Sequence, residues 1–333
     1  MRDADLYGAA GVGGAGSPSG GAGASAETAA ETAIEAVIEA SGLRKSYGAV
    51  EAVRGVDLRV PRGSIYGFLG RNGAGKTTTI KMLLGMVRPG GGRGRVLGLR
   101  IDDARESVEA RRRTGFVGED KGLYDYMTVG QMVAFTRPFF PRWRADLEAK
   151  YLRAFDLPPG RKVRALSKGM RTKLALLLAL ARGAELLVLD EPTEGLDPAA
   201  SEELLGILAG LVAAEELTVF FSSHQIADVE QVADRVCVLH RGRVRVEGAL
   251  DDLKESYRRV RLVYGDEAPP AAAFAATPGV ERVQADGRWL TLLVSRDAER
   301  LAGEARAAGA LDVEVCPVGL KEIFLETAGE RDE

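Results

Sequence analysis

The segment Gly70-Arg-Asn-Gly-Ala-Gly75-Lys76-Thr77 matches the pattern G-x-x-x-x-G-K-[ST] in full. It follows a short apolar stretch that predicts a strand, residues 64–69, and it opens a helical pattern that runs to about Val87. Glycines let a loop wrap closely around phosphates, while the N–H groups of the loop and of the helix start face the anion. The motif therefore predicts a nucleotide-binding loop, with the Lys76 ammonium on the β- and γ-phosphates and the Thr77 hydroxyl on Mg²⁺.

A second apolar stretch, residues 186–189, ends in two acidic residues, Asp190 and Glu191. At the end of a strand, Asp190 can hold the magnesium shell. Glu191 lies at the same edge and can polarise the attacking water, and general-base help of this kind is worth about 10²–10⁴ in rate. The phosphate-binding loop alone indicates only a nucleotide, because kinases, GTPases and helicases share it.

The organisation of the chain indicates an α/β fold. Residues 104–182 have a mostly helical pattern, and apolar strand-like stretches lie before and after them. Strands that alternate with helices favour a largely parallel sheet with helices on both faces. The expected strands are residues 37–40, 49–60, 64–69, 186–189 and 218–221, followed by a hairpin over 236–246 that turns at Arg241-Gly242.

Composition divides the chain into three parts. Residues 1–34 are dominated by Gly, Ala and Ser and cannot bury enough apolar surface to offset their ordering entropy, so we expect a disordered tail. A change near residue 255 separates a main domain, residues 35–255, from a small α/β appendix, residues 256–333. The appendix is expected to contain strands at 260–264, 289–294 and 313–316, a helix at 298–308, a loop at 268–278, and core positions at Val260, Leu262, Leu290, Leu292, Leu320, Ile323 and Phe324.

The whole-chain composition limits the classes of function. The formal net charge of −3 gives no reason to expect nucleic-acid binding, for which a strongly basic face is typical. Cys237 and Cys316 lie far apart without metal-ligand spacing, so we expect buried free thiols in a reducing compartment. The sequence has no run of 18 apolar residues and no signal-peptide pattern. We therefore expect a soluble protein whose link to a membrane runs through a partner.

Four further motifs carry a family resemblance. Leu166-Ser167-Lys168-Gly169-Met170 resembles the signature of ATP-binding-cassette (ABC) ATPases, which is usually written Leu-Ser-Gly-Gly-Gln. Glu194-Gly-Leu-Asp197-Pro198 is similar to the D-loop, Ser222-Ser-His224 to the switch histidine, and Ser46-Tyr47-Gly48 to the aromatic loop. With the phosphate-binding loop they follow the order of an ABC cassette over about residues 38 to 250.

The resemblance implies a P-loop NTPase cassette with a RecA-like core, an antiparallel β subdomain and a helical subdomain, followed by the small α/β appendix. It implies an ATPase that binds ATP and Mg²⁺, in which two cassettes sandwich two ATP molecules. The loop at residues 70–78 of one cassette then faces residues 167–169 of the other. The implied ATP contacts are Tyr47, Gly70, Arg71, Asn72, Gly73, Ala74, Gly75, Lys76, Thr77, Thr78, Ser167, Gly169 and Asp197.

By the same resemblance, His224 contacts the γ-phosphate and holds the water with Glu191, so that Lys76, Glu191 and His224 are the catalytic residues. The other histidine, His240, is interpreted as structural. Tyr47 is expected to stack on adenine, which is worth about 1–3 kcal/mol per base; the alternative is a surface tyrosine.

Three positions depart from the family pattern or have a second interpretation. Glu119 stands where the family usually has glutamine, and it is either a Mg²⁺ ligand with Thr77 and Asp190 or a solvated loop acid. Ser167 is a phosphate contact, a helix N-cap, or both. Lys168 either attracts phosphate or extends into solvent.

The Leu-Ser-Lys-Gly-Met variant, Arg137-Pro-Phe-Phe-Pro-Arg-Trp143 and Leu320-Lys-Glu-Ile-Phe-Leu325 resemble one branch, the ATPases of bacterial ABC exporters with separate membrane subunits. This implies two partners, a membrane-spanning permease subunit and a second ABC ATPase subunit, and a cytoplasmic location at the inner face of the membrane. The permease is expected to dock beside Leu123, Tyr124, Tyr126 and Met127, some of which instead anchor their own loop. The alternatives are a soluble ABC ATPase acting on nucleic acid or ribosomes, an importer ATPase, and another P-loop class such as a kinase.

Overall fold

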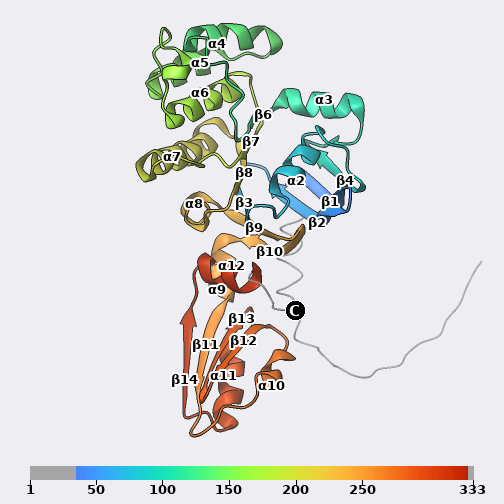
Figure 1. Cartoon of the computed structure of the whole chain (residues 1–333), viewed down its shortest axis with the longest axis vertical. Coiled ribbons are helices and arrows are strands. Elements are labelled where there is room, and N and C mark those ends of the chain that lie inside the picture. Colours follow the sequence, from blue (N-terminus) through green and yellow to red (C-terminus); the bar gives the residue numbers. More distant parts are fainter. Residues whose placement is uncertain (1–34, 329–333) are drawn as a thin grey trace, which may run out of the picture. The chain divides into compact units, whose positions relative to one another are not determined.

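The computed structural model describes residues 35–328, whose helices and strands are labelled in Figure 1. The expected disordered tail, residues 1–34, lies outside the described residues. No helix within residues 35–328 combines the length and the apolar character needed to cross a membrane.

An antiparallel sheet of four strands begins the fold. Its strand order is β2-β1-β4-β5, with β1 at Ala36–Tyr47, β2 at Val50–Pro61, β4 at Gly91–Val96 and β5 at Leu99–Arg100. The first two strands were expected, although β1 extends well beyond residue 40. Strands β4 and β5 were not expected. The sequence of β4, GGRGRV, is rich in glycine and arginine, and it shows only a weak alternation of apolar and polar residues.

The central sheet positions the functional motifs. Its order is β10-β9-β3-β8-β7-β6, formed by β3 (Ile65–Gly70), β6 (Thr114–Val117), β7 (Leu186–Asp190), β8 (Thr218–Ser223), β9 (Arg235–His240) and β10 (Arg243–Ala249). All its strand pairs are parallel except the β9–β10 hairpin, which the sequence predicted correctly. Residues 104–182 are mostly helical, as expected, and the four-residue strand β6 within them was not expected. Because parallel strands end at the same edge, the loops after β3, β6, β7 and β8 meet there.

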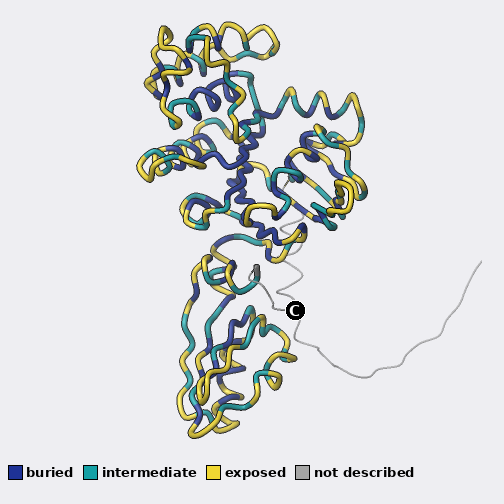
Figure 2. The backbone as a smooth tube through the Cα atoms, viewed as in Figure 1, coloured by how far each residue is buried: buried dark blue, intermediate teal, exposed yellow. Residues whose placement is uncertain are grey.

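Each face of the central sheet packs on a separate core. Along β3, Ile65 and Leu69 face the core of the helical side, whereas Tyr66 and Phe68 face the core shared with the antiparallel sheet. This alternation follows the two-residue period of a strand. Every residue of β3, β7 and β8 is buried, and in Figure 2 these strands run as a dark line through the middle of the cassette.

The helices of the cassette are α2 (Lys76–Leu83), α3 (Ala104–Arg113), α4 (Val129–Thr136), α5 (Ala145–Ala154), α6 (Lys168–Ala181), α7 (Pro198–Glu215) and α8 (Ile226–Val232). Helix α2 ends before the expected Val87, because Gly85 takes the left-handed conformation with φ of +61°. A Cβ atom at Gly85 would lie 2.7 Å from the Cβ atom of Ser107, so this close approach also needs glycine.

The C-terminal residues form a third sheet with the order β12-β13-β11-β14, antiparallel throughout. Strand β12 and the short helix α10 were not expected; α10 lies within the predicted loop. Val260, Leu262, Leu290 and Leu292 share a small core of their own with α11. The elements are α9 (Leu250–Ser256), β11 (Arg258–Val263), α10 (Ala272–Ala275), β12 (Val280–Asp286), β13 (Trp289–Val294), α11 (Ala298–Ala307), β14 (Asp312–Pro317) and α12 (Leu320–Ala328).

The final helix, α12, packs differently from the rest of the appendix. Its buried residues Leu320, Ile323 and Phe324 belong to the large core of the cassette, not to the small core of the third sheet. Helix α12 contacts α8, α9, β9 and β10, and it also contacts β12 of the third sheet. The sequence identified these three residues as core positions, but it could not show which of the two cores they join.

Candidate nucleotide-binding and hydrolysis site

The phosphate-binding loop lies between β3 and α2, where the sequence placed it. Gly73 and Gly75 have φ values of +79° and +106°, in the region that glycine adopts without strain. A Cβ atom at Gly75 would lie 2.5 Å from the carbonyl oxygen of Ala52, so no larger residue fits. Gly75 is the N-cap of α2 and supplies no side chain to cap it, which leaves the first N–H groups of the helix available to an anion.

A cavity of about 430 Å³ opens at this loop. It collects segments that are far apart in the sequence, because the strands that carry them end at the same edge. Among the described residues its lining is Ala52, Asn72, Gly73, Gly75, Lys76, Thr77, Thr78, Glu119, Glu191, Glu194 and His224.

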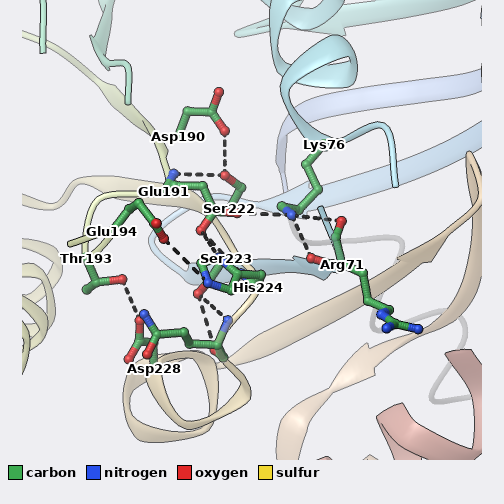
Figure 3. A network of polar contacts seen from close by, with 12 residues as sticks. Arg71, Lys76, Asp190, Glu191, Thr193, Glu194, Ser222, Ser223, His224 and Asp228 are labelled. Carbon is green, nitrogen blue, oxygen red and sulfur yellow. Dashed lines mark hydrogen bonds and ion pairs between the residues drawn. The ribbon is translucent and has the colours of Figure 1, made fainter. Parts of the chain in front are cut away.

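A buried ion pair lies among the lining residues of the cavity (Figure 3). The Nζ atom of Lys76 lies 3.0 Å from Oε1 of Glu191, and the two side chains are only 5% and 9% exposed. The same Nζ atom donates to the carbonyl oxygens of Gly70 at 2.6 Å and Arg71 at 3.2 Å. Removed from water, such charges interact more strongly, and losing either partner leaves the other buried and uncompensated.

A serine ties the acidic pair to the neighbouring strand. The Ser222 hydroxyl on β8 donates to Oδ1 of Asp190 at 2.7 Å and accepts the backbone N–H of Glu191 at 3.0 Å. Glu191 has a φ value of +49°, which is unusual for a residue with a side chain. This left-handed turn after β7 lets Asp190 and Glu191 point in different directions from the same strand end.

His224 lies between two carboxylates. Its Nδ1 is 2.9 Å from Oε2 of Glu191 and its Nε2 is 3.4 Å from Oε2 of Glu194. The contact with Glu191 is a hydrogen bond whose donor depends on the imidazole tautomer, and the contact with Glu194 is longer. Thr193, beside Glu194, donates to Asp228 of α8 at 2.5 Å and fixes the loop that carries this glutamate. The sequence identified Glu194 only as the start of the D-loop.

Two groups of side chains could hold a metal ion. Glu191, Glu194 and His224 offer ligand atoms that all lie within 4.8 Å of one another. In the set expected from sequence, Thr77 and Glu119 line the cavity, and Asp190 is buried beside it at the end of β7. That second set offers only oxygen donors, the kind that Mg²⁺ prefers, so its chemistry fits the expected ion.

Several predicted ATP contacts lie outside this cavity. Tyr47 is half exposed at the end of β1, with the Lys45 ammonium 5.4 Å from its ring centre. Ser167 is the N-cap of α6 and accepts the N–H of Met170, while Asp197 is the N-cap of α7 and accepts the N–H of Ala200. Neither of these caps lines the cavity, and neither does Gly169 in the first turn of α6.

Lys168 is exposed, but its amine does not extend freely into solvent. A Cβ atom placed on Gly195 would lie 2.6 Å from the Nζ atom of Lys168, so the ammonium rests against the D-loop. His240 is buried at the end of β9 and does not line the cavity.

The sequence gave no indication of one further cation, Lys121. Its Nζ atom is inaccessible to solvent and has no hydrogen-bond partner within residues 35–328. Burial lowers the pKa of this ammonium, whereas the charges of Glu119 and Asp190 act in the opposite direction. The burial of this ammonium becomes visible only in the folded structure of the loop after β6.

A glycine-rich loop at the start of a helix, with an acidic pair and a histidine at the ends of neighbouring parallel strands, defines a P-loop nucleoside triphosphatase. The family model described as "ABC transporter" matches residues 53–194. The daunorubicin resistance ATP-binding protein DrrA3 of Streptomyces coeruleorubidus is 37% identical over 306 residues, covering 87% of this chain and 95% of that protein. The Nod factor export ATP-binding protein I of Ralstonia nicotianae is 34% identical over 305 residues, covering 86% and 92%.

A solved ATP-binding cassette, described as dimeric, in a post-hydrolysis state and bound to ADP and Pi, has the same fold. It aligns with a TM-score of 0.58 at 22% identity, covering 64% of this chain and 98% of that one. The chain belongs to the ABC transporter family, as an ATP-binding subunit with ATPase activity. The predicted fold class is confirmed, and these relatives give no support to a soluble ATPase acting on nucleic acid or ribosomes.

Proposed function

We propose that this chain hydrolyses Mg·ATP to drive export through a separate membrane-spanning permease at the inner face of the cell membrane. The observation that carries the proposal is the network of Lys76, Glu191 and His224 around the cavity of the phosphate-binding loop. The direction of transport is supported by the relatives, one named for resistance to daunorubicin and the other for export of Nod factor.

In this proposal each residue has a defined role in phosphoryl transfer. The loop N–H groups and the Lys76 ammonium hold the β- and γ-phosphates and stabilise the charge that develops on them. Glu191 polarises the attacking water, and His224 holds that water and the γ-phosphate in line. Glu194 fixes the imidazole from the side opposite Glu191.

The metal site consists of Thr77, Asp190 and Glu119 in the same proposal. Mg²⁺ bound there would neutralise charge on the β- and γ-phosphate oxygens. Ser222 orients the Asp190 carboxylate by donating to one of its oxygens, so the carboxylate is held in place before the ion binds.

The residues outside the cavity support an ATP sandwich. Ser167 and Asp197 are exposed at the N-terminal ends of α6 and α7, with Gly169 in the first turn of α6. A helix N-terminus favours an anion, so this end of α6 suits the γ-phosphate bound by another cassette. The partner is a second ABC ATPase subunit, identical or different, and the half-exposed ring of Tyr47 stacks on adenine.

An aromatic patch offers the permease a docking surface. We define it as Tyr124, Tyr126, Phe135 and Phe139, which are 42–70% exposed. Their rings are in successive contact, with centroids 5.5–5.7 Å apart. The other two apolar residues of the loop, Leu123 and Met127, pack on the cassette core and anchor it. The patch thus separates the expected loop residues into two that anchor and two that are available to a partner.

Cross-linking tests the partner. Tyr124→Cys in a Cys316→Ser background should cross-link to a cysteine in a cytoplasmic loop of the co-expressed permease, and ATP should change the yield. Leu311→Cys is the matched control, because Leu311 is an exposed apolar residue of the appendix, 73% exposed and outside the patch. Equal cross-linking at both positions, or none at Tyr124 with any neighbouring membrane gene, would contradict docking at the patch.

A further inference from the structure

Lys121 occupies a turn whose geometry is demanding. Its N–H donates to the carbonyl oxygen of Gly118 at 3.1 Å, closing a turn directly after β6. The φ value of Lys121 is +61°, in the left-handed region that residues with side chains seldom adopt. Such a conformation persists where the surroundings hold it, and such positions cluster at functional sites.

The ammonium of Lys121 is hidden from solvent but has no local hydrogen-bond partner. Its Nζ atom is almost inaccessible to solvent and donates to no hydrogen-bond acceptor within residues 35–328. A buried ammonium is costly unless opposite charges compensate it. Burial lowers the pKa of this ammonium, and the nearby carboxylates of Glu119, Asp190, Asp120 and Glu191, at or beside the ATP site, act to raise that pKa.

The cavity has an excess of negative charge. Glu119, Glu191 and Glu194 line it, against the single ammonium of Lys76 among its lining residues. Mg·ATP adds further negative charge, and each uncompensated carboxylate beside the γ-phosphate opposes its binding. Glu119 introduces one such charge where the family usually has a neutral glutamine, and Lys121 follows it by two residues.

We infer that Lys121 is a positioning residue of the ATP site, whose buried ammonium offsets the charge of Glu119 and thereby sets the affinity for Mg·ATP. This inference rests on the proposed function, which places the γ-phosphate and Mg²⁺ beside Glu119. The two residues act as a charge pair that replaces one neutral side chain, so the effect of either one depends on the other.

A double-mutant cycle on the full chain tests this dependence, with Lys121→Met, Glu119→Gln and the double variant. Lys121→Met should raise the KM for Mg·ATP about tenfold, with a smaller change in kcat, and it should have little effect once Glu119 is Gln. Lys121→Arg keeps the charge and should retain the parental KM. The same rise in KM in both backgrounds would show a packing role and overturn the inference, as would no rise in either.

Two controls separate the possible failures. Lys254→Met removes a partly exposed lysine that pairs with Glu230 far from the cavity, and it should leave the KM unchanged. Thermal unfolding without nucleotide shows whether Lys121→Met is folded. If it is not, Lys121→Arg is compared with the parent in both Glu119 backgrounds. A rise in the KM for Mg·ATP in Lys121→Arg, although the charge is kept, would overturn the inference. Parental hydrolysis by Glu191→Gln would instead refute the proposed mechanism, whatever the result of the cycle.

Discussion

The cassette presents two sets of functional residues in contrasting environments. Lys76 and Glu191 are buried among the residues that line the cavity and form an ion pair with each other. Ser167 and Asp197 are exposed, and each hydroxyl or carboxylate accepts an N–H of the helix that it begins. The buried residues contact residues that are far apart in the sequence, whereas these hydrogen bonds of Ser167 and Asp197 reach only three residues along the chain. In the proposed ATP sandwich, the buried set serves the chemistry and the exposed set faces a neighbouring cassette.

The largest effect is expected in the buried set. Lys76→Ala should abolish ATP hydrolysis, because the phosphates lose a fixed cation. It should also destabilise the protein by about 3–5 kcal/mol, because the buried Glu191 carboxylate loses its partner. Phosphate release and denaturant unfolding measure the two effects. Release near the parental rate would show that the ion pair is only structural.

The exposed set should affect assembly rather than folding. Glu191→Gln should bind ATP, turn over about 10²–10⁴-fold more slowly, and shift from monomer to dimer on size exclusion. Adding Ser167→Arg should block that shift, because it places bulk against the opposing phosphate, while the unfolding midpoint changes little. A dimer that persists in the double variant would remove Ser167 from the interface.

The smallest effect on ATP binding is expected from substitutions in the appendix, and two matched substitutions test this. Ile323→Ala removes a buried side chain from the cassette core and should cost about 2–5 kcal/mol, whereas Leu301→Ala creates a similar cavity in the core of the third sheet. Without denaturant both should bind ATP as the parent does. The denaturant concentration at which ATP binding is lost should fall only for Ile323→Ala; an equal fall for both would mean that the two cores unfold together.

The sequence predicted the elements that carry strong local signals. Residues 186–189 and 218–221 are short, largely apolar runs of the kind that a sheet covered on both faces requires, and both lie in strands. Elements with weaker local signals were not predicted. The four residues of β6, TGFV, lie between segments with a helical pattern, and β12 has several polar, exposed residues, as a loop would.

The site was predictable as far as it follows motifs. Lys76, Thr77, Glu119, Glu191 and His224 meet at one cavity because their segments follow adjacent parallel strands. The contacts that depend on side-chain direction could not be read in advance. Nothing local distinguishes Lys121 or Glu194 from a solvated surface charge; burial and the distance to His224 do so only after the chain has folded.

The return of the last helix gives the appendix two attachments to the cassette. The chain enters the appendix through α9 and leaves it through α12, and both helices contribute to the same apolar core. The appendix is therefore held by two packed helices, α9 and α12, and not by a single linker. Helix α12 also contacts α8, which begins two residues after His224. A displacement of the appendix would therefore reach the segment that carries His224 through the contact between α12 and α8.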